Sequence, residues 1–149
     1  MNPSQTCISN IKRFEGCVLH AYPDPKTGGD PWTIGWGSTG AGIKQGVTWT
    51  QQQADERLAS DVAAFGQSVL TALSGAPTTQ GQFDALVSFA YNLGLRKALG
   101  STLWRMHMAH DYSGAAGQFG LWINKGSSVE KGLRARRAAE MAIYQGHQP

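Results

Sequence analysis

Strand-forming residues that are repeatedly interrupted by glycine and proline run from Val18 to about Lys44, in a chain whose other patterns are helical. The strand formers are Leu19, Tyr22, Trp32, Thr33, Ile34 and Trp36, and the breakers are Pro23, Pro25, Gly28, Gly29, Pro31, Gly35 and Gly37. The stretch predicts an antiparallel sheet of two or three short strands. Because so small a sheet is not stable alone, it has to pack against helices, and the crevice between the two parts suits a long, chain-like ligand.

Helix signals occupy the rest of the chain. Asn2 and Pro3 predict a helix start, and Gly16 predicts its end. Thr50 with Gln53, and Thr79 with Gln82, have the spacing of capping boxes. The first of these boxes opens a helix to about Leu73, and the second opens a helix too apolar for the surface, which should be the central helix of the core.

Three further helices are expected in the last third of the chain. Ser101 and Ser113 are candidate starts for two of them. Ser127 with Glu130 is a candidate capping box for the last one. That helix is expected to turn its apolar residues inward, namely Leu133, Ala138, Met141 and Tyr144.

Length and composition indicate one soluble, folded domain over residues 1–149. Of the 149 residues 41% are hydrophobic and 15% charged, which excludes a disordered chain. The net charge of +3 and the pI near 9.0 favour an anionic partner without identifying it. Basic residues gather late and predict a positive patch, formed by Lys125, Lys131, Arg134, Arg136 and Arg137.

Cys7 and Cys17 are the only cysteines. If helical rise persists across the ten residues between them, their α-carbons lie roughly 15 Å apart, too far for a disulfide. The four histidines show no metal-binding spacing with the cysteines, so we expect neither metal nor cofactor. The N-terminal residues contain no apolar run of signal-peptide or membrane-anchor length.

Two acids flank the start of the predicted sheet. Glu15 follows Ile11 by four residues, so its side chain should leave the first helix beside the apolar stripe and be partly buried. Burial disfavours the charged carboxylate, so Glu15 should hold its proton near neutral pH, as a general acid must. Asp24 lies in a polar turn, Tyr-Pro-Asp-Pro, which should keep it ionised.

Two acids in unlike surroundings predict glycosidic bond cleavage. Asp30 is an alternative second carboxylate, because it lies three residues before Thr33. The hydroxyl of Thr33, facing the crevice, could share with Asp24 the task of holding a water molecule below the sugar ring. Carboxyl groups roughly 6.5 to 9.5 Å apart leave room for that water and give inversion, whereas roughly 5 to 5.5 Å gives retention. A threonine able to order water favours inversion.

The chain resembles the phage-type lysozymes, the endolysins of glycoside hydrolase family 24, over nearly its whole length. The resemblance rests on Glu15-Gly16, Ala21–Asp24, Gly28–Gly37, Gly132-Leu133, Arg136-Arg137 and Glu140, in the family's order. It implies an α+β, mostly helical lysozyme-like fold, with a small antiparallel sheet lobe at about 16–50 and a larger helical lobe at about 74–149 joined by the N-terminal helix. It also implies that Glu15, Asp24 and Thr33 take the places of the family's catalytic triad.

The resemblance further implies hydrolysis of the β-1,4 bond between N-acetylmuramic acid and N-acetylglucosamine in bacterial peptidoglycan, for lysis of a bacteriophage host. We expect a monomer that is made in the host cytoplasm without a signal peptide and reaches the wall through a separate pore-forming lysis protein. The alternatives are a lytic transglycosylase and a catalytically silent wall-binding module. A nucleic-acid binder is the weakest alternative, because no signature of one occurs.

Ser38 stands where the family usually has a histidine that supports the fold through an ion pair, so we expect a change in stability rather than lost chemistry.

One of the two late arginines is expected to reach back and orient Glu15, as a basic residue of the last helix does in the family. Arg137 is favoured over Arg136 for that contact and for substrate binding.

Overall fold

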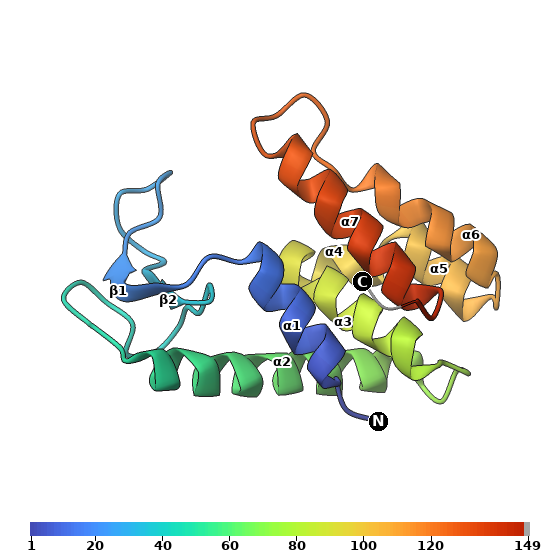
Figure 1. Cartoon of the computed structure of the whole chain (residues 1–149), viewed down its shortest axis with the longest axis horizontal. Helices are drawn as coiled ribbons and strands as arrows, with labels where there is room; N and C mark the ends of the chain where they lie inside the picture. Colours follow the sequence, from blue (N-terminus) through green and yellow to red (C-terminus); the bar gives the residue numbers. More distant parts are fainter. Residues whose placement is uncertain (148–149) are drawn as a thin grey trace.

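The computed structural model describes residues 1–147 and is mostly helical (Figure 1). Its elements are, in chain order, α1 (Gln5–Phe14), β1 (Val18–Tyr22), β2 (Thr33–Gly35), α2 (Gln51–Leu73), α3 (Gln80–Leu93), α4 (Leu95–Leu99), α5 (Thr102–Met108), α6 (Tyr112–Gln118), the 3-10 helix η1 (Phe119–Leu121) and α7 (Glu130–Tyr144). The expected α+β class with a small sheet lobe and a larger helical lobe is confirmed.

The sheet consists of β1 and β2, which pair antiparallel with Val18 opposite Gly35 and Tyr22 opposite Thr33. An irregularity between these two pairs offsets the longer strand against the shorter one. The hairpin and its loops, residues 16–50, form the sheet-bearing lobe beside the start of α2 (Figure 1). The prediction of two or three short strands leaning on helices is therefore confirmed.

Both predicted capping boxes are present. The Thr50 side chain accepts a hydrogen bond from Gln53 N, and the Gln53 side chain accepts one from Thr50 N, at the start of α2. Thr79 and Gln82 do the same at the start of α3. These two boxes fix where the long helix below the sheet and the helix inside the core begin.

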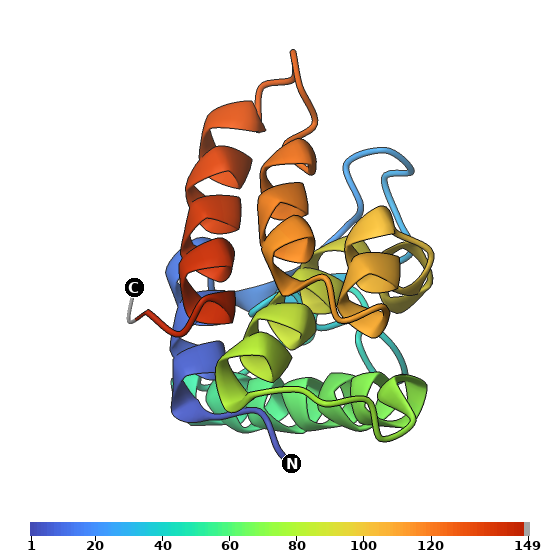
Figure 2. The same cartoon turned by 90° about the vertical axis from the view of Figure 1, so that its right-hand side faces the viewer.

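The core lies around α3, as its apolar sequence predicts. All nine residues from 82 to 90 are buried, and α3 packs against α1, α2, α4 and α7. Seen from the side, α6 and α7 stand next to one another above this helix (Figure 2). Phe89 makes edge-to-face contacts with Phe119 and Trp122, which tie the α6–α7 connection to the core.

Several predicted helix starts are wrong. The N-cap of α1 is Ser4 rather than Asn2, and the Ser4 hydroxyl donates a hydrogen bond to Asp84 instead of capping the helix. The N-cap of α6 is Asp111, whose side chain accepts from Gly114 N, rather than Ser113. At α1 the competing partner, Asp84, is 80 positions away and the local sequence does not reveal it. At α6 the cap is local, and Asp111 is a preferred N-cap residue two positions before the predicted one.

The last helix also departs from its prediction at both the cap and the buried face. Val129 is the N-cap of α7, while the Glu130 carboxylate accepts from Gly126 N. Ala138 is exposed, because the buried face carries Arg136, Arg137, Ala139 and Glu140. The short helix α4 has no counterpart among the helices that the sequence patterns predict.

Cys7 and Cys17 are both free, as the sequence predicts, with Cys7 buried in the core. Burial raises the pKa of the Cys7 thiol, which keeps it neutral. Across residues 1–147 no helix has the length and apolar character needed to cross a membrane.

Candidate active site

Glu15 lies where α1 gives way to the sheet-bearing lobe. The helix ends at Phe14, and Glu15 has extended backbone angles, φ −92° and ψ 134°, with its N–H still donating to Ile11 O at 2.8 Å. Its side chain is 26% exposed, so the predicted partial burial is confirmed. A residue at this junction is held by the helix while its carboxylate reaches into the space beside the sheet.

The arginine that contacts Glu15 is Arg136, with 2.7 Å between Nη1 and Oε1. The prediction that Arg137 makes this contact is wrong. Adjacent residues of an α-helix point about 100° apart, so only one of these two neighbouring arginines can face α1. Arg137 instead donates to the carbonyl oxygen of Trp122 and to Asn92 and Glu140.

Arg136 is itself fixed by a buried polar network. Its Nε lies 3.2 Å from Glu140 Oε2, and its Nη2 donates to the carbonyl oxygen of Ser88. The Ser88 hydroxyl donates to Glu140 Oε2 at 2.6 Å and accepts from Asn10 Nδ2 at 3.0 Å. The network joins α1, α3 and α7, so the cation beside Glu15 has a fixed position.

Sequence reasoning missed Ser88 and Asn10. A weak signal was present for each, because Asn10 lies on the apolar stripe of α1 and Ser88 lies within the apolar run of α3. Asn10 is 3% exposed and Ser88 is 0% exposed. Such residues normally require a hydrogen-bond partner from another element. Asn10 Oδ1 is buried without one in the described structure.

The predicted positive patch is smaller than expected. Arg136 and Arg137 are buried in ion pairs with Glu140, so they do not contribute to the surface. Lys125, Lys131 and Arg134 are exposed. A solvated patch of three basic residues remains, and Arg134 is paired with Glu130.

The second oxygen of Glu15 lies beside the turn that follows β2. Gly37, with φ +96°, is placed so that a Cβ there would lie 3.8 Å from Glu15 Oε2 and 4.0 Å from the Tyr91 hydroxyl. Burial, reinforced by the negative charge of Glu15, raises the pKa of Tyr91, which keeps its hydroxyl neutral. One oxygen of Glu15 therefore meets a cation, and the other meets backbone and a neutral phenol.

Asp24 and Thr33 lie at the loop end of the hairpin. Thr33 pairs with Tyr22, and Asp24 follows Tyr22 by two residues, so the register brings the two close together along the hairpin. The Asp24 carboxylate accepts from Lys26 N at 2.8 Å, and its carbonyl accepts from Gly28 N. This turn holds Asp24 half-buried, while Asp30 is exposed.

Ser38, at the position that is usually histidine in the family it resembles, is 2% exposed and donates its hydroxyl proton to Asp61 Oδ2 at 2.7 Å. Arg57 forms an ion pair with the other oxygen of Asp61 at 2.9 Å and also donates to the carbonyl oxygen of Thr39. The charged partner of this acid therefore comes from α2, while the serine supplies a neutral hydrogen bond.

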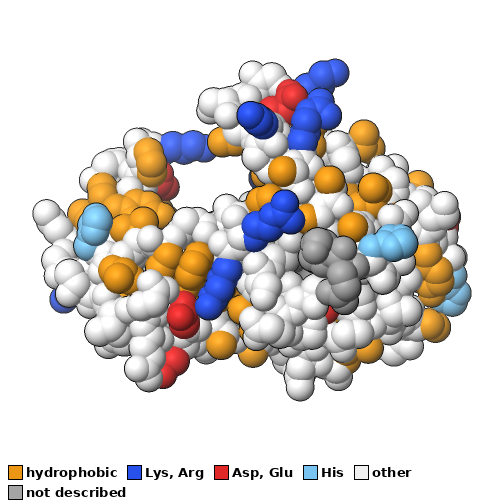
Figure 3. Space-filling model, viewed as in Figure 1, with side chains coloured by type: hydrophobic (Ala, Val, Ile, Leu, Met, Phe, Trp, Pro, Cys, Tyr) orange, Lys and Arg blue, Asp and Glu red, His pale blue; other side chains and the backbone are white. Residues whose placement is uncertain are grey.

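Glu15 and Arg136 line a pocket of about 350 Å³, together with Phe14, Asn92, Ser128, Val129, Gly132 and Leu133. A neighbouring pocket of about 710 Å³ shares Asn92, Val129 and Leu133 with it and includes Arg137. A hollow separates the sheet-bearing lobe from the start of α7 on the surface (Figure 3). The acid thus lies in an open depression between the ends of α1 and α3 and the start of α7.

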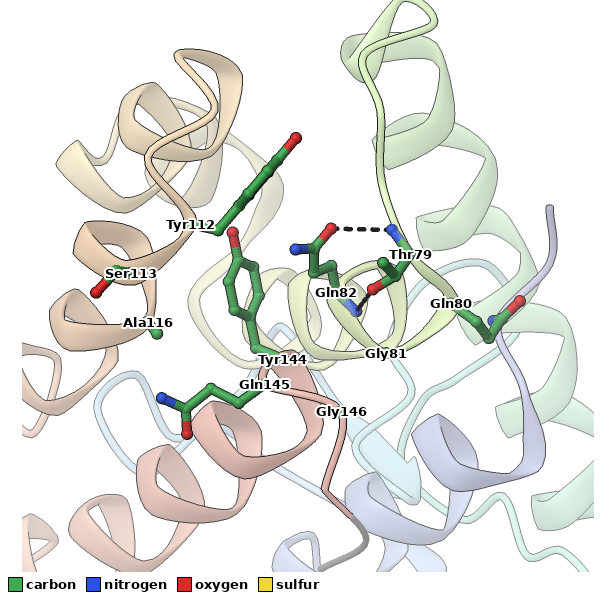
Figure 4. A pocket seen from close by; sticks show the side chains of 10 residues that line it. All are labelled: Thr79, Gln80, Gly81, Gln82, Tyr112, Ser113, Ala116, Tyr144, Gln145 and Gly146. Atoms are coloured by element: carbon green, nitrogen blue, oxygen red, sulfur yellow. Dashed lines mark hydrogen bonds between the residues drawn. The ribbon is translucent and has the colours of Figure 1, made fainter.

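Another pocket, of about 620 Å³, lies away from Glu15, between the start of α3, α6 and the end of α7 (Figure 4). Its rim carries the Thr79–Gln82 capping box, and Tyr112 and Tyr144 line one side.

Within residues 1–147, no cluster of three or more His, Cys, Asp or Glu residues could hold a metal ion.

Comparisons with known proteins agree with this architecture. The family model described as Phage lysozyme matches residues 12–140. An endolysin of Bacillus phage PZA is 40% identical over 149 residues, which are all of this chain and 57% of that protein. The chain spans 54% to 60% of the length of the first four curated relatives that it matches.

Two solved structures have the same fold. An endolysin from the Escherichia coli O157:H7 phage FAHEc1 superposes with a TM-score of 0.83 and 36% identity, covering 100% of this chain and 97% of the other. The muramidase domain of SpmX from Asticaccaulis excentricus also superposes with a TM-score of 0.83. It is 32% identical, and the match covers 95% of this chain and 96% of the other. On the family match, the sequence identity and the shared fold together, the chain belongs to the phage lysozyme family.

Proposed function

We propose that this protein is a muramidase of the endolysin type, which hydrolyses the β-1,4 bond between N-acetylmuramic acid and N-acetylglucosamine in bacterial peptidoglycan. The observation that carries the proposal is the placement of Glu15. It lines an open depression with Oε1 held by a buried arginine and Oε2 directed toward the turn after β2. A carboxyl group fixed in this way can present a proton to one atom of a bound polymer.

In the proposed reaction Glu15 is the general acid. Its proton passes to the glycosidic oxygen as the bond to the anomeric carbon breaks, leaving the carboxylate that Arg136 stabilises. A water molecule attacks the anomeric carbon from the opposite face of the sugar ring.

Asp24 and Thr33 are proposed to hold that water. The Asp24 carboxylate accepts one proton of the water as it attacks, while the Thr33 hydroxyl orients it. Support comes from the hairpin register, which places both residues near one another, and from the half-buried position of each. Attack by water rather than by a carboxylate gives inversion at the anomeric carbon.

Replacement of Glu15 by Gln tests the acid. We expect Glu15→Gln to abolish clearing of a cell-wall suspension while sedimentation with the walls is retained. Glu56→Gln is the matched control, because Glu56 is exposed on α2 and bonds only to Gln52 among the described residues. Clearing by Glu15→Gln at a rate near that of the native protein would contradict the proposal, and binding without clearing by the native protein would indicate a silent wall-binding module.

The first product separates the two enzyme alternatives. Hydrolysis gives reducing ends, whereas a lytic transglycosylase gives anhydro ends, and mass spectrometry of digested peptidoglycan distinguishes them. NMR spectra recorded before mutarotation identify the anomer that is released first, and this anomer tests inversion. Anhydro ends would identify the reaction as transglycosylation and would contradict hydrolysis.

The cellular setting is also a proposal. We infer that residues 1–149 act as one catalytic domain and as a monomer, made in the host cytoplasm and active on the cell wall at lysis. Access would then require a separate pore-forming lysis protein. Expression of the protein in a bacterial host with and without a membrane-permeabilising agent tests this route, because lysis should require the agent.

A further inference from the structure

Trp36, in the turn after β2, is held by side chains from three helices. The Tyr91 hydroxyl, from α3, donates to the Trp36 carbonyl oxygen at 2.8 Å. The indole Nε1 donates to Asp55 Oδ1, from α2, also at 2.8 Å. Lys12, from α1, lies 5.4 Å from the ring centroid and 3.3 Å from the same Asp55 oxygen. We call Tyr91, Asp55 and Lys12 the Trp36 clamp.

The residue next to Trp36 borders the reactive end of Glu15. Gly37 is the position at which a Cβ would lie 3.8 Å from Oε2, while Oε1 is already bonded to Arg136. In the structure of residues 1–147 no side chain or backbone group donates a hydrogen bond to Oε2. Oε2 is therefore the oxygen that is open to carry the proton, and the Gly37 turn defines one side of its surroundings.

We propose that Tyr91 is a positioning residue, which fixes the Gly37 turn against Glu15 Oε2 by donating its hydroxyl proton to the Trp36 carbonyl. This inference rests on the proposed role of Glu15 as the acid. Because its proton is committed to a backbone oxygen, Tyr91 acts through the turn and not on the bound polymer. Asp55 assists from the other side of Trp36 by holding the indole.

The clamp has the rigidity that positioning requires. The Tyr91 ring packs on Phe65 of α2 with 5.4 Å between centroids, so the hydroxyl is directed by a fixed ring. The hydrogen bond joins residues 55 positions apart and connects the helical lobe to the sheet-bearing lobe. A shift of the turn by a fraction of an ångström would change the geometry of proton transfer more than it would change the overall fold.

A pair of matched substitutions tests the role. Tyr91→Phe keeps the ring and removes the bond to Trp36, whereas Tyr112→Phe removes the bond from the Tyr112 hydroxyl to the Pro77 carbonyl, 3.1 Å long and away from Glu15. On a soluble peptidoglycan fragment we expect Tyr91→Phe to lower kcat roughly 5- to 50-fold with KM within about twofold. Tyr112→Phe should leave kcat and KM near their native values. The thermal unfolding midpoint of each variant should lie well above the assay temperature.

A double-mutant cycle distinguishes positioning from a direct role. Trp36→Phe removes the indole bond to Asp55, so it should lower kcat as well, and the combination with Tyr91→Phe should cost less than the product of the two single effects. Equal activity of Tyr91→Phe and Tyr112→Phe, or independent effects in the cycle, would overturn the inference. If Tyr91→Phe does not fold, an unchanged kcat in Trp36→Phe alone overturns it. If the native protein fails to clear cell walls, that result would instead contradict the proposed function.

Discussion

Arg136 Nη1 lies 2.7 Å from Glu15 Oε1, although 121 positions separate the two residues in the sequence. The arginine is 3% exposed and also bonds to Glu140, which is 0% exposed. The candidate acid is thus attached to the polar network inside the helical lobe. Substitutions within that network are expected to affect both the fold and the site.

Removal of Arg136 should be strongly destabilising. Arg136→Ala leaves Glu140 with only Arg137 as a cationic partner and leaves Glu15 with none among the described residues. Breaking a buried ion pair by removing one partner costs about 3–5 kcal/mol of the free energy of unfolding. Urea denaturation monitored by circular dichroism measures this. Arg134→Ala, which removes an exposed pair with Glu130, is the control and should be nearly neutral.

The two candidate second carboxylates can be separated by substitution. Asp24→Asn should lower the rate of peptidoglycan hydrolysis about 10²- to 10⁴-fold, because it removes the proposed proton acceptor for the water. Asp30→Asn should change the rate little, because Asp30 is exposed and, among residues 1–147, only its backbone carbonyl is bonded, to the Thr27 hydroxyl. Rates from turbidity loss, with folding checked by thermal denaturation, decide the assignment. The reverse order of effects would make Asp30 the second carboxylate.

Gly81 allows α3 and the end of α7 to pack closely beside the pocket of Figure 4. A Cβ at this position would lie 2.5 Å from the carbonyl oxygen of Ile143. Because that atom belongs to the backbone, α7 would have to shift, and Gly81→Ala should cost about 1–3 kcal/mol of the free energy of unfolding. Gly117→Ala is the control, since a Cβ there meets nothing within 4 Å and the residue lies in α6. It should be neutral or slightly stabilising.

Stability should fall as the pH drops below about 6.5, partly through His107. The ring is 0% exposed and bonds to the hydroxyls of Thr78 and Tyr144 at 2.9 and 2.6 Å. Burial, and then the charge of His110, lower the pKa of His107. The folded state therefore binds fewer protons than the unfolded chain. The stabilisation is complete above the unfolded pKa and is lost as the pH falls from there toward the folded one.

Thermal midpoints measured between pH 7.5 and 5 test this dependence. His107→Gln should flatten the slope in that range, at the expense of some stability at neutral pH. His20→Gln, at an exposed position of the sheet-bearing lobe, should leave the slope unchanged. An unaltered slope in His107→Gln would show that other groups cause the acid sensitivity.

Local signals predicted the fold well. Thr50 and Thr79 cap their helices with partners that lie within four residues, so the local sequence contains both halves of each box. Ser4 shows the limit of such signals. Its hydroxyl bonds to Asp84, 80 positions away, and that partner decides where α1 begins.

The site was predictable in part for the same reason. Glu15 could be placed at the end of a helix from the four residues before it. The choice between Arg136 and Arg137 depended on the rotation of α7 about its axis, and the inward prediction for Ala138 depended on it too. Two arginines and Glu140 occupy part of the buried face, and a count of apolar residues does not detect them. Tyr144 is buried as predicted and Leu133 and Met141 are half-buried, so only Ala138 is wrong among the four residues predicted to point inward.

The contact between Glu15 and Arg136 also has a consequence for biosynthesis. A ribosome that has just added Glu15 must translate 121 further codons before the arginine exists. From the addition of residue 50 onward, the nascent chain contains the acid and the entire sheet-bearing lobe without the cation that pairs with the carboxylate. The pair therefore forms only after residues 15–136 have all been synthesised.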